Sequence, residues 1–316
     1  MRRKITFIRC VLSVVLAFAG LAPAAVAATA AEPLAPGRPG QSGQPGQPGQ
    51  PRQWDRAARG RTAVGVVHGG ADGRVAGRTF RGEGFDTCQA PDRATMDAWR
   101  AGSPYGAAGI YFGGRARACS TQANLTPDWV RRTTEAGWSL LPIYVGSQSP
   151  CVTGANKNPY RIDTGNPVAQ GISEGEDAIR AAGALGLAPG SALYLDMEAY
   201  DVDDTACTTA TLRYIQAWDR RVRVGGYLSG YYSSADSGVA HLESARRAGA
   251  ADLPDAIWYA RWGVAASVTK EPSLAADAWT PHARIHQYHG SVTESYGGKK
   301  LTIDRDLIDA PVAVVG

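Results

Sequence analysis

The sequence predicts an α/β fold, a closed (β/α)8 TIM-type barrel with parallel strands. Two observations predict it: short apolar segments alternate with segments of helical periodicity, and eight apolar segments fall between residues 82 and 312. Alternating strands and helices indicate a parallel sheet, and eight strands are the number that closes such a sheet into this barrel. A doubly wound open sheet is the alternative, because alternation alone does not require closure.

Strands are expected where short apolar segments are bounded by glycine, proline or polar residues. They cover residues 82–88, 107–114, 139–146, 191–200, 225–232, 256–262, 283–290 and 301–308. Helices are expected where apolar residues recur at helical spacing. They cover residues 92–102, 126–137, 172–186, 208–224 and 241–249. Thr126 and Pro127 are a typical cap and first-turn pair for the second of these helices.

An export signal is expected over residues 1–30, where the charged MRRK precedes the apolar run VLSVVLAFAGLAPAAVA and small-residue cleavage sites. Cys10 lies inside this signal and leaves with it. Arg2-Arg3 fits twin-arginine export, and the general secretory route fits equally. The apolar run is short for a membrane span. We therefore expect a secreted protein, extracellular or associated with the cell wall, without a membrane span after cleavage.

The segment between the signal and the barrel differs from both in composition. Residues 31–53 contain a GQP repeat with nothing to bury, which predicts a disordered, extended linker. Residues 54–81 form an unassigned extension, in which residues 63–70 are compatible with a short strand. The barrel domain is expected over residues 82–316.

The charge of the chain argues against nucleic acid as a partner. The formal net charge is +4, and the signal alone supplies the four positive residues Arg2, Arg3, Lys4 and Arg9 without any acid. The mature chain is therefore close to neutral, with no basic stripe along which a phosphate backbone could bind.

We expect the protein to be a monomer.

The segment SALYLDMEAY, residues 191–200, is the strongest candidate for a site. In a strand, alternate side chains face opposite sides, so Asp196 and Glu198 share one face and the leucines share the other. Two neighbouring carboxyl groups repel each other, which favours a proton on one beside an ionised partner, as cleavage of a glycosidic bond requires. The alternative is that arginines pair with both acids or that they lie on a solvated edge strand.

In a barrel of this type, functional residues gather where the parallel strands end. Polar residues late in the expected strands fit this rule: Asp86, Asp196, Glu198, Gln287, Asp304 and Asp306. Tyr200, Tyr231 and Trp262 are candidate aromatic contacts for sugar rings at the same end. Each of these aromatic residues is equally compatible with ordinary core packing.

Four cysteines remain after removal of the signal: Cys88, Cys119, Cys151 and Cys207. In an exported protein they are expected to form disulfides, for which three pairings exist. Because neighbouring loops of a barrel lie side by side, Cys88–Cys119 and Cys151–Cys207 are favoured. Zinc is the less favoured reading because no CxxC or Cys/His spacing is present. We expect no metal and no cofactor.

Two further patterns suggest other chemistry. Residues 171–175 match the G-x-S-x-G motif of serine hydrolases, with Ser173 as the nucleophile. That motif needs a preceding strand, and Ser173 is better explained as a helix N-cap with Glu176 three residues later. His282, His286 and His289 are close in sequence, but His286 and His289 face opposite sides of a strand and do not share a metal.

The motifs GFDTCQAP, SPYGAAGIYFGG, NLTPDWV, GWSLLPIYVG, YLDMEAY, GGYLSGYYSS, IWYARW, RIHQYHG and TIDRDLID occur in that order. Together they resemble the glycoside-hydrolase-like domain of secreted actinobacterial proteins, over about residues 82 to 312. More distantly, the chain is similar to the (β/α)8 N-acetylmuramidases that carry a D-x-E strand.

This resemblance implies roles for individual residues. It implies that Glu198 is the general acid/base and that Asp196 stabilises the developing positive charge. It implies that Asp86 and Asp304 tune this pair and bind sugar hydroxyls, with Tyr231 and Gln287 positioning the ring. It also implies that no metal is used.

The expected function is therefore a secreted glycoside hydrolase acting on peptidoglycan or a related N-acetylated polysaccharide. Because fold does not fix function, the alternative is a non-catalytic glycan-binding protein on the same barrel. A serine hydrolase built on Ser173 is a third possibility.

Overall fold

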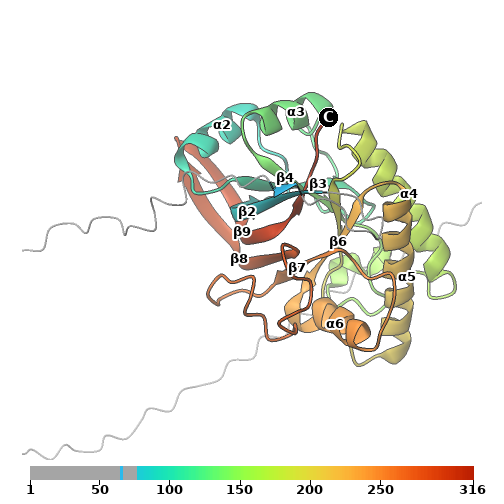
Figure 1. The fold of residues 1–316 in the computed structure, drawn as a ribbon. Coiled ribbons are helices and arrows are strands. Elements are labelled where there is room, and N and C mark those ends of the chain that lie inside the picture. Colours follow the sequence, from blue (N-terminus) through green and yellow to red (C-terminus); the bar gives the residue numbers. More distant parts are fainter. Residues whose placement is uncertain (1–64, 67–76) are drawn as a thin grey trace, which may run out of the picture. The chain divides into compact units, whose positions relative to one another are not determined.

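Eight strands, β2 to β9, pair in the order in which they occur in the chain, and β2 also pairs with β9 (Figure 1). The computed structural model describes residues 65–66 and 77–316; the expected signal and linker, and most of the extension, lie outside the described residues. The closed barrel is confirmed, and the open sheet is wrong. The strands are β1 Gly65–Val66, β2 Arg78–Asp86, β3 Ala107–Gly113, β4 Ser139–Tyr144, β5 Ala192–Asp196, β6 Leu228–Ser234, β7 Ala256–Ala260, β8 Arg284–Tyr296 and β9 Lys299–Val312.

The last strand corrects the prediction that all strands are parallel. Neighbours from β2 to β8 run parallel, whereas β9 runs antiparallel to both β8 and β2. Gly297 and Gly298, both with positive φ, are all that connects β8 to β9. A two-residue connection makes a hairpin and is far too short for a parallel crossover.

Helices cover the barrel between successive strands up to β7. They are α2 Arg93–Gly102, α3 Pro127–Glu135, α4 Pro167–Ala184, α5 Thr205–Val224 and α6 Ala240–Arg247, with a 3-10 helix, η2 Ala155–Tyr160, and a π-helical turn, η3 Ala235–Val239. Thr126 caps α3 as expected, because its side chain accepts a hydrogen bond from the Trp129 N–H at 3.1 Å. Among the described residues, no helix is long and apolar enough to cross a bilayer.

Helix α4 removes the serine-hydrolase alternative. It begins at Pro167, so residues 171–175 lie inside a helix and no strand precedes them directly. A nucleophile elbow needs a sharp strand-to-helix turn at the serine. The expectation that Ser173 caps this helix is also wrong, because the N-cap position belongs to Asn166.

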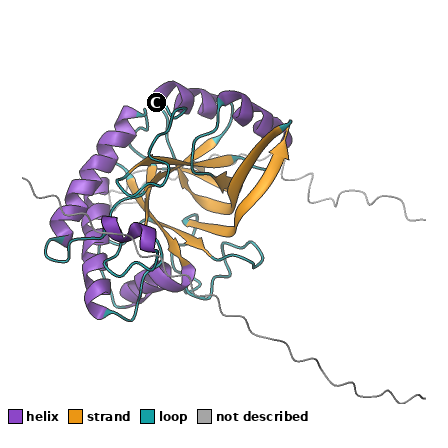
Figure 2. Ribbon diagram, turned by 180° about the vertical axis from the view of Figure 1, so that it is seen from behind, coloured by secondary structure: helices purple, strands orange, loops and turns teal. Residues whose placement is uncertain are grey.

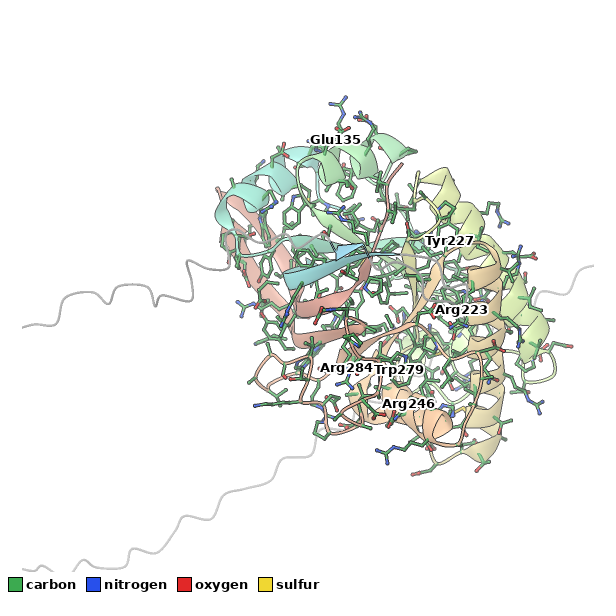
Figure 3. The ribbon with its side chains drawn as sticks, viewed as in Figure 1. Glu135, Arg223, Tyr227, Arg246, Trp279 and Arg284 are labelled. Atoms are coloured by element: carbon green, nitrogen blue, oxygen red, sulfur yellow. A yellow bond between two sulfur atoms is a disulfide. The ribbon has the colours of Figure 1, made fainter. Side chains whose placement is uncertain are left out.

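The ring of helices is incomplete. Within the described part of the chain, no helix follows β7 or β8, and Figure 2 shows the helices as an arc that does not close around the strands. Residues 261–283 connect β7 to β8 instead. Arg284 donates to the carbonyls of Ala278 at 2.8 Å and Ala275 at 2.7 Å, and Trp279 donates to the Pro254 carbonyl at 2.7 Å (Figure 3). These bonds hold the connection against the barrel where a crossover helix would otherwise pack.

One apolar layer lies inside the barrel, and a second lies between the strands and the helices. Tyr194 lies inside the barrel, where its hydroxyl donates to the Pro311 carbonyl on the non-adjacent strand β9 at 2.6 Å. Leu193, Leu195 and Met197 belong to the other layer, between the strands and the helices. The alternation expected for this strand is therefore confirmed, and it directs Asp196 inward with Tyr194.

Both favoured disulfides are confirmed. Cys88–Cys119 joins the loops that follow β2 and β3, and Cys151–Cys207 joins the loop after β4 to the first turn of α5. The two bridges therefore fix four consecutive connections at one end of the barrel.

Candidate active site

Carboxyl groups from three strands meet at the end of the barrel where the parallel strands finish. Asp86 is the last residue of β2, Asp196 is the last residue of β5, and Glu198 follows two residues later. Asp304 is paired with Asp86 in the register of β2 and β9. It was expected late in a parallel strand. Asp304 lies at this end because β9 runs antiparallel and the first half of β9 is at this end.

Asp86, Gln287 and Asp304 form one hydrogen-bonded group. The Gln287 amide nitrogen donates to Asp86 Oδ2 at 2.8 Å and reaches Asp304 Oδ2 at 3.5 Å. The Gln287 amide oxygen accepts from Tyr232 and from Trp262, both at 3.0 Å. Gln287 therefore connects two acids on one side to two aromatic side chains on the other.

Asp86 is held partly protonated by its surroundings. Burial, followed by the negative charge of Asp304, raises the pKa of Asp86 to about 7, against the opposing hydrogen bonds from Tyr111 and Gln287. Burial also raises the pKa of Asp304, while the Ser291 N–H, which donates at 2.6 Å, and the charge of His289 act in the opposite direction. Asp86 therefore titrates near neutral pH, and Asp304 holds its proton more strongly than an ordinary aspartate.

Asp196 and Glu198 differ in their surroundings. Asp196 is 5% exposed and its Oδ1 makes no hydrogen bond. Glu198 retains 40% of its side-chain exposure, and its Oε1 lies 3.4 Å from the ammonium of Lys157. Burial, followed by the charge of Glu198, raises the pKa of Asp196 well above its usual range. The alternative in which arginines pair with both acids does not describe this geometry.

Three candidate residues lie away from the open end of the barrel. Asp306 is fully buried below the cluster, with its Oδ1 accepting from Trp258 at 3.0 Å. Tyr231 is fully buried in the layer between strands and helices. Tyr200 is 3% exposed in the same layer, and its hydroxyl bonds His241 Nδ1 at 2.7 Å. The expectation that these three contact a sugar is not supported by their positions.

The tyrosine of this strand that faces the candidate site is Tyr232, the residue after Tyr231. Tyr232 is the neighbour that faces the barrel interior, as its bond to Gln287 shows. Strand β6 begins at Leu228 rather than at residue 225, and its side chains alternate from there. Tyr111, which donates to Asp86 Oδ1 at 2.8 Å, and Lys157 were not singled out from the sequence either. Tyr111 follows the inward alternation of its strand, but Lys157 lies in a long loop without a periodic signal.

Trp262 is the exposed aromatic side chain of the group. It retains 54% of its exposure although its indole nitrogen bonds Gln287. Two surface cavities lie elsewhere: one of about 480 Å³ between α2 and α3, and one of about 340 Å³ beside the Cys151–Cys207 bridge. Neither is lined by a carboxyl group of the cluster. Trp262 and Glu198 are the members of the cluster with the most exposed side chains.

The histidines do not gather. His282 bonds Asp309 at 2.7 Å. His286 Nδ1 accepts from the Ser267 N–H at 3.1 Å, and its Nε2 donates to the Arg261 carbonyl at 2.9 Å. In the described ranges, no group of three or more histidine, cysteine, aspartate or glutamate side chains could hold a metal ion.

The closed barrel and the acids at the end of its strands define a glycoside hydrolase-like protein. The chain belongs to the Rv2525c-like, glycoside hydrolase-like domain family, whose model matches residues 97–308. No curated protein matches the chain.

Several solved structures are similar to the chain at low sequence identity. The Tat-secreted protein Rv2525c of Mycobacterium tuberculosis, in complex with L-tartrate, is 15% identical, with 72% of this chain and 95% of that one covered and a TM-score of 0.48. An uncharacterized B. stearothermophilus protein is 20% identical, with 72% and 95% covered and a TM-score of 0.47. The modular autolysin LytC of Streptococcus pneumoniae is 13% identical, with 79% and 52% covered and a TM-score of 0.44.

Proposed function

We propose that this protein is a secreted glycoside hydrolase acting on peptidoglycan or a related N-acetylated polysaccharide. The observation that carries the proposal is the pair Asp196 and Glu198, one buried and one partly exposed, at the end of a glycoside hydrolase-like barrel where the parallel strands finish. Hydrolysis of a glycosidic bond needs one carboxyl group that gives a proton and a second that is ionised. Unequal burial is how two neighbouring acids acquire these different states.

The neighbouring residues supply contacts for a sugar. Asp304 and Glu198 are partly exposed acceptors for hydroxyl groups, and the exposed face of Trp262 provides an apolar surface for a sugar ring. Gln287 links Trp262 to Asp86 and so holds the ring platform at a fixed position relative to the acids. The resemblance to N-acetylmuramidases supplies the substrate class.

Export is part of the same proposal. Its support is the expected signal over residues 1–30 together with the two disulfides, because disulfides persist in oxidising compartments. Peptidoglycan and related wall polysaccharides are met outside the membrane, where an exported hydrolase would act.

The test is release of reducing ends from purified cell wall and from a panel of polysaccharides. We expect the mature protein to release them, and Glu198→Gln and Asp196→Asn to lower the rate at least about a hundredfold, because each removes a proton-transfer or charge-stabilising group. Asp203→Asn, at an exposed acid in the loop after β5, is the matched control. Circular dichroism and thermal unfolding verify that each variant is folded.

Binding without turnover is the outcome that would favour the second candidate, a glycan-binding protein. The exposed Trp262 is compatible with either function. Wall glycans that are retained by the protein, with no new reducing ends and with equal affinity for Glu198→Gln, would exclude hydrolysis and leave binding as the function.

A further inference from the structure

Lys157 is a buried cation beside the carboxyl pair. It lies on η2, in the loop that follows β4, and is 7% exposed. Its ammonium donates to the Ala116 carbonyl at 3.2 Å and lies 3.4 Å from Glu198 Oε1. A buried ammonium is stable when an anion is adjacent. Glu198 is the carboxylate with which this ammonium is paired.

Asp196 has no comparable partner. Its side chain lies at the end of β5 with Oδ1 buried and without a hydrogen bond. A buried carboxyl oxygen without a partner favours the neutral form of the acid. The cation that faces the pair is therefore placed on Glu198, whereas Asp196 Oδ1 stays buried without a hydrogen-bond partner.

The backbone around the two acids is fixed by one side chain. Gln148 is fully buried, donates to the Asp196 carbonyl at 2.9 Å and accepts from the Glu198 N–H at 2.8 Å. Because both ends of its amide are used, Glu198 stays beside Lys157 and Asp196 stays inside. The difference in surroundings is therefore a property of the folded chain.

We propose that Lys157 is a positioning residue that holds Glu198 as the carboxylate, so that Asp196 carries the proton of the pair. The inference rests on the proposed function and deepens it, because it reverses the roles that the family resemblance implies for the two acids. Asp196 becomes the proton donor to the glycosidic oxygen, and Glu198 becomes the ionised group.

The charged and titratable groups around Asp196 agree with this assignment. They come from every strand and loop packed against it: Asp86, Tyr111, Lys157, Glu198, Tyr231 and Tyr232. Burial and the charges of Glu198 and Asp86 raise the pKa of Asp196, and Lys157 opposes them. The three tyrosines are neutral because burial raises the pKa of each.

The chemical step balances with this assignment. The Asp196 proton passes to the glycosidic oxygen as the bond from that oxygen to the anomeric carbon breaks, and the bonding pair leaves with the oxygen. Water adds to the anomeric carbon and its proton returns to the carboxylate of Asp196. Glu198 stays ionised and stabilises the positive charge that develops on the sugar.

The test is the carbon NMR spectrum of the two side-chain carboxyl groups, recorded against pH in the mature, fully folded protein. Asp196→Asn and Glu198→Gln assign the signals, each by loss of one. We expect the Asp196 carboxyl carbon to keep its protonated position at neutral pH while that of Glu198 has the carboxylate position. The opposite distribution, with Glu198 protonated and Asp196 ionised, would overturn the proposal.

Two variants test the cause. Lys157→Met should let Glu198 share the proton, so that Asp196 is no longer the one acid that stays protonated at neutral pH, whereas Lys270→Met, at an exposed lysine, should leave the wild-type distribution unchanged. Glu198→Gln should move the Asp196 titration to lower pH, because a negative charge is removed. A Lys157→Met protein in which Asp196 alone stays protonated, as in wild type, would refute the role of Lys157.

The spectrum does not depend on turnover. Asp196 protonated in a protein that releases no reducing ends would refute the proposed hydrolysis and leave the proton assignment standing. Reducing ends released by a protein in which Glu198 is protonated would support hydrolysis and refute the proton assignment.

Discussion

Asp86 shows how one buried acid makes stability depend on pH. Its pKa is raised from an ordinary value of 3.8 to about 7, so the folded protein keeps a proton that the unfolded chain releases. The folded state then binds more protons between these values, and stability from this residue is complete below about pH 4 and is lost as the pH rises through about 7.

Asp86→Asn should therefore change the pH dependence of unfolding. The free energy of unfolding of the variant, relative to wild type, should rise between about pH 5 and pH 8 by on the order of a few kcal/mol. The amide also disturbs the bonds to Tyr111 and Gln287, but that cost does not vary with pH. Urea unfolding at both pH values measures the difference, and a difference that stays constant would show that Asp86 is ionised throughout.

The position of the Trp262 ring can be changed without replacing Trp262 itself. A Cβ on Gly290 would lie 2.3 Å from the indole Cζ2, so Gly290→Ala must displace the exposed ring. We expect Gly290→Ala and Trp262→Ala to weaken glycan binding by up to about tenfold, as for loss of one aromatic contact. Val264→Ala, at another exposed apolar residue of the same loop, is the control. Equal affinity in all three variants, measured by calorimetry, would exclude Trp262 from the binding surface.

At the scale of the elements, the long loops at the open end are held by covalent bonds. The bridge Cys151–Cys207 spans 56 residues and attaches the loop that carries Lys157 to α5, and Cys88–Cys119 spans 31 residues. Closing a loop lowers the conformational entropy of the unfolded chain, and it does so more for a longer loop. The bridges therefore help to keep Lys157 beside Glu198.

Replacing both cysteines of one bridge by alanine should lower the free energy of unfolding by about 4 kcal/mol for either bridge, and slightly more for Cys151–Cys207, which closes the longer loop. Chemical denaturation of the two double variants and of wild type measures this. Removal of Cys151–Cys207 should also lower the rate on wall glycan. Double variants that unfold at the wild-type denaturant concentration would show that the loops are held by their other contacts.

The direction of β9 was predicted incorrectly, although the sequence contains a signal for the hairpin of β8 and β9. Gly297-Gly298 between two alternating segments is a strong hairpin signal. Counting β9 as the eighth parallel strand of a repeating unit overrode this local signal. The error left Asp304 at the correct end of the barrel, because an antiparallel strand enters from the end at which a parallel one finishes.

At the scale of the whole molecule, strand order followed from periodicity alone, because each apolar segment pairs with the next. The acids Asp86 and Asp196 were located because parallel strands bring their carboxyl ends together, and Asp304 was located although its strand runs antiparallel. Tyr232, Tyr111 and Lys157 were missed, since side-chain direction depends on where a strand begins and on the path of a loop. Neither is encoded in a short motif.

The same distinction separates fold from function. The barrel is fixed by the inner and outer apolar layers, whereas the chemistry depends on a few polar side chains at one rim. These side chains, and Asp196 and Glu198 above all, are the groups that we propose break a glycosidic bond.

The most direct test is to digest purified cell wall in water labelled with heavy oxygen and to analyse the fragments by mass spectrometry. Hydrolysis by the carboxyl pair predicts one heavy oxygen at the anomeric carbon of each new reducing end, with wild-type protein and not with Glu198→Gln. Fragments without the label, or label in peptide carboxyl groups, would contradict glycosidic cleavage by this site.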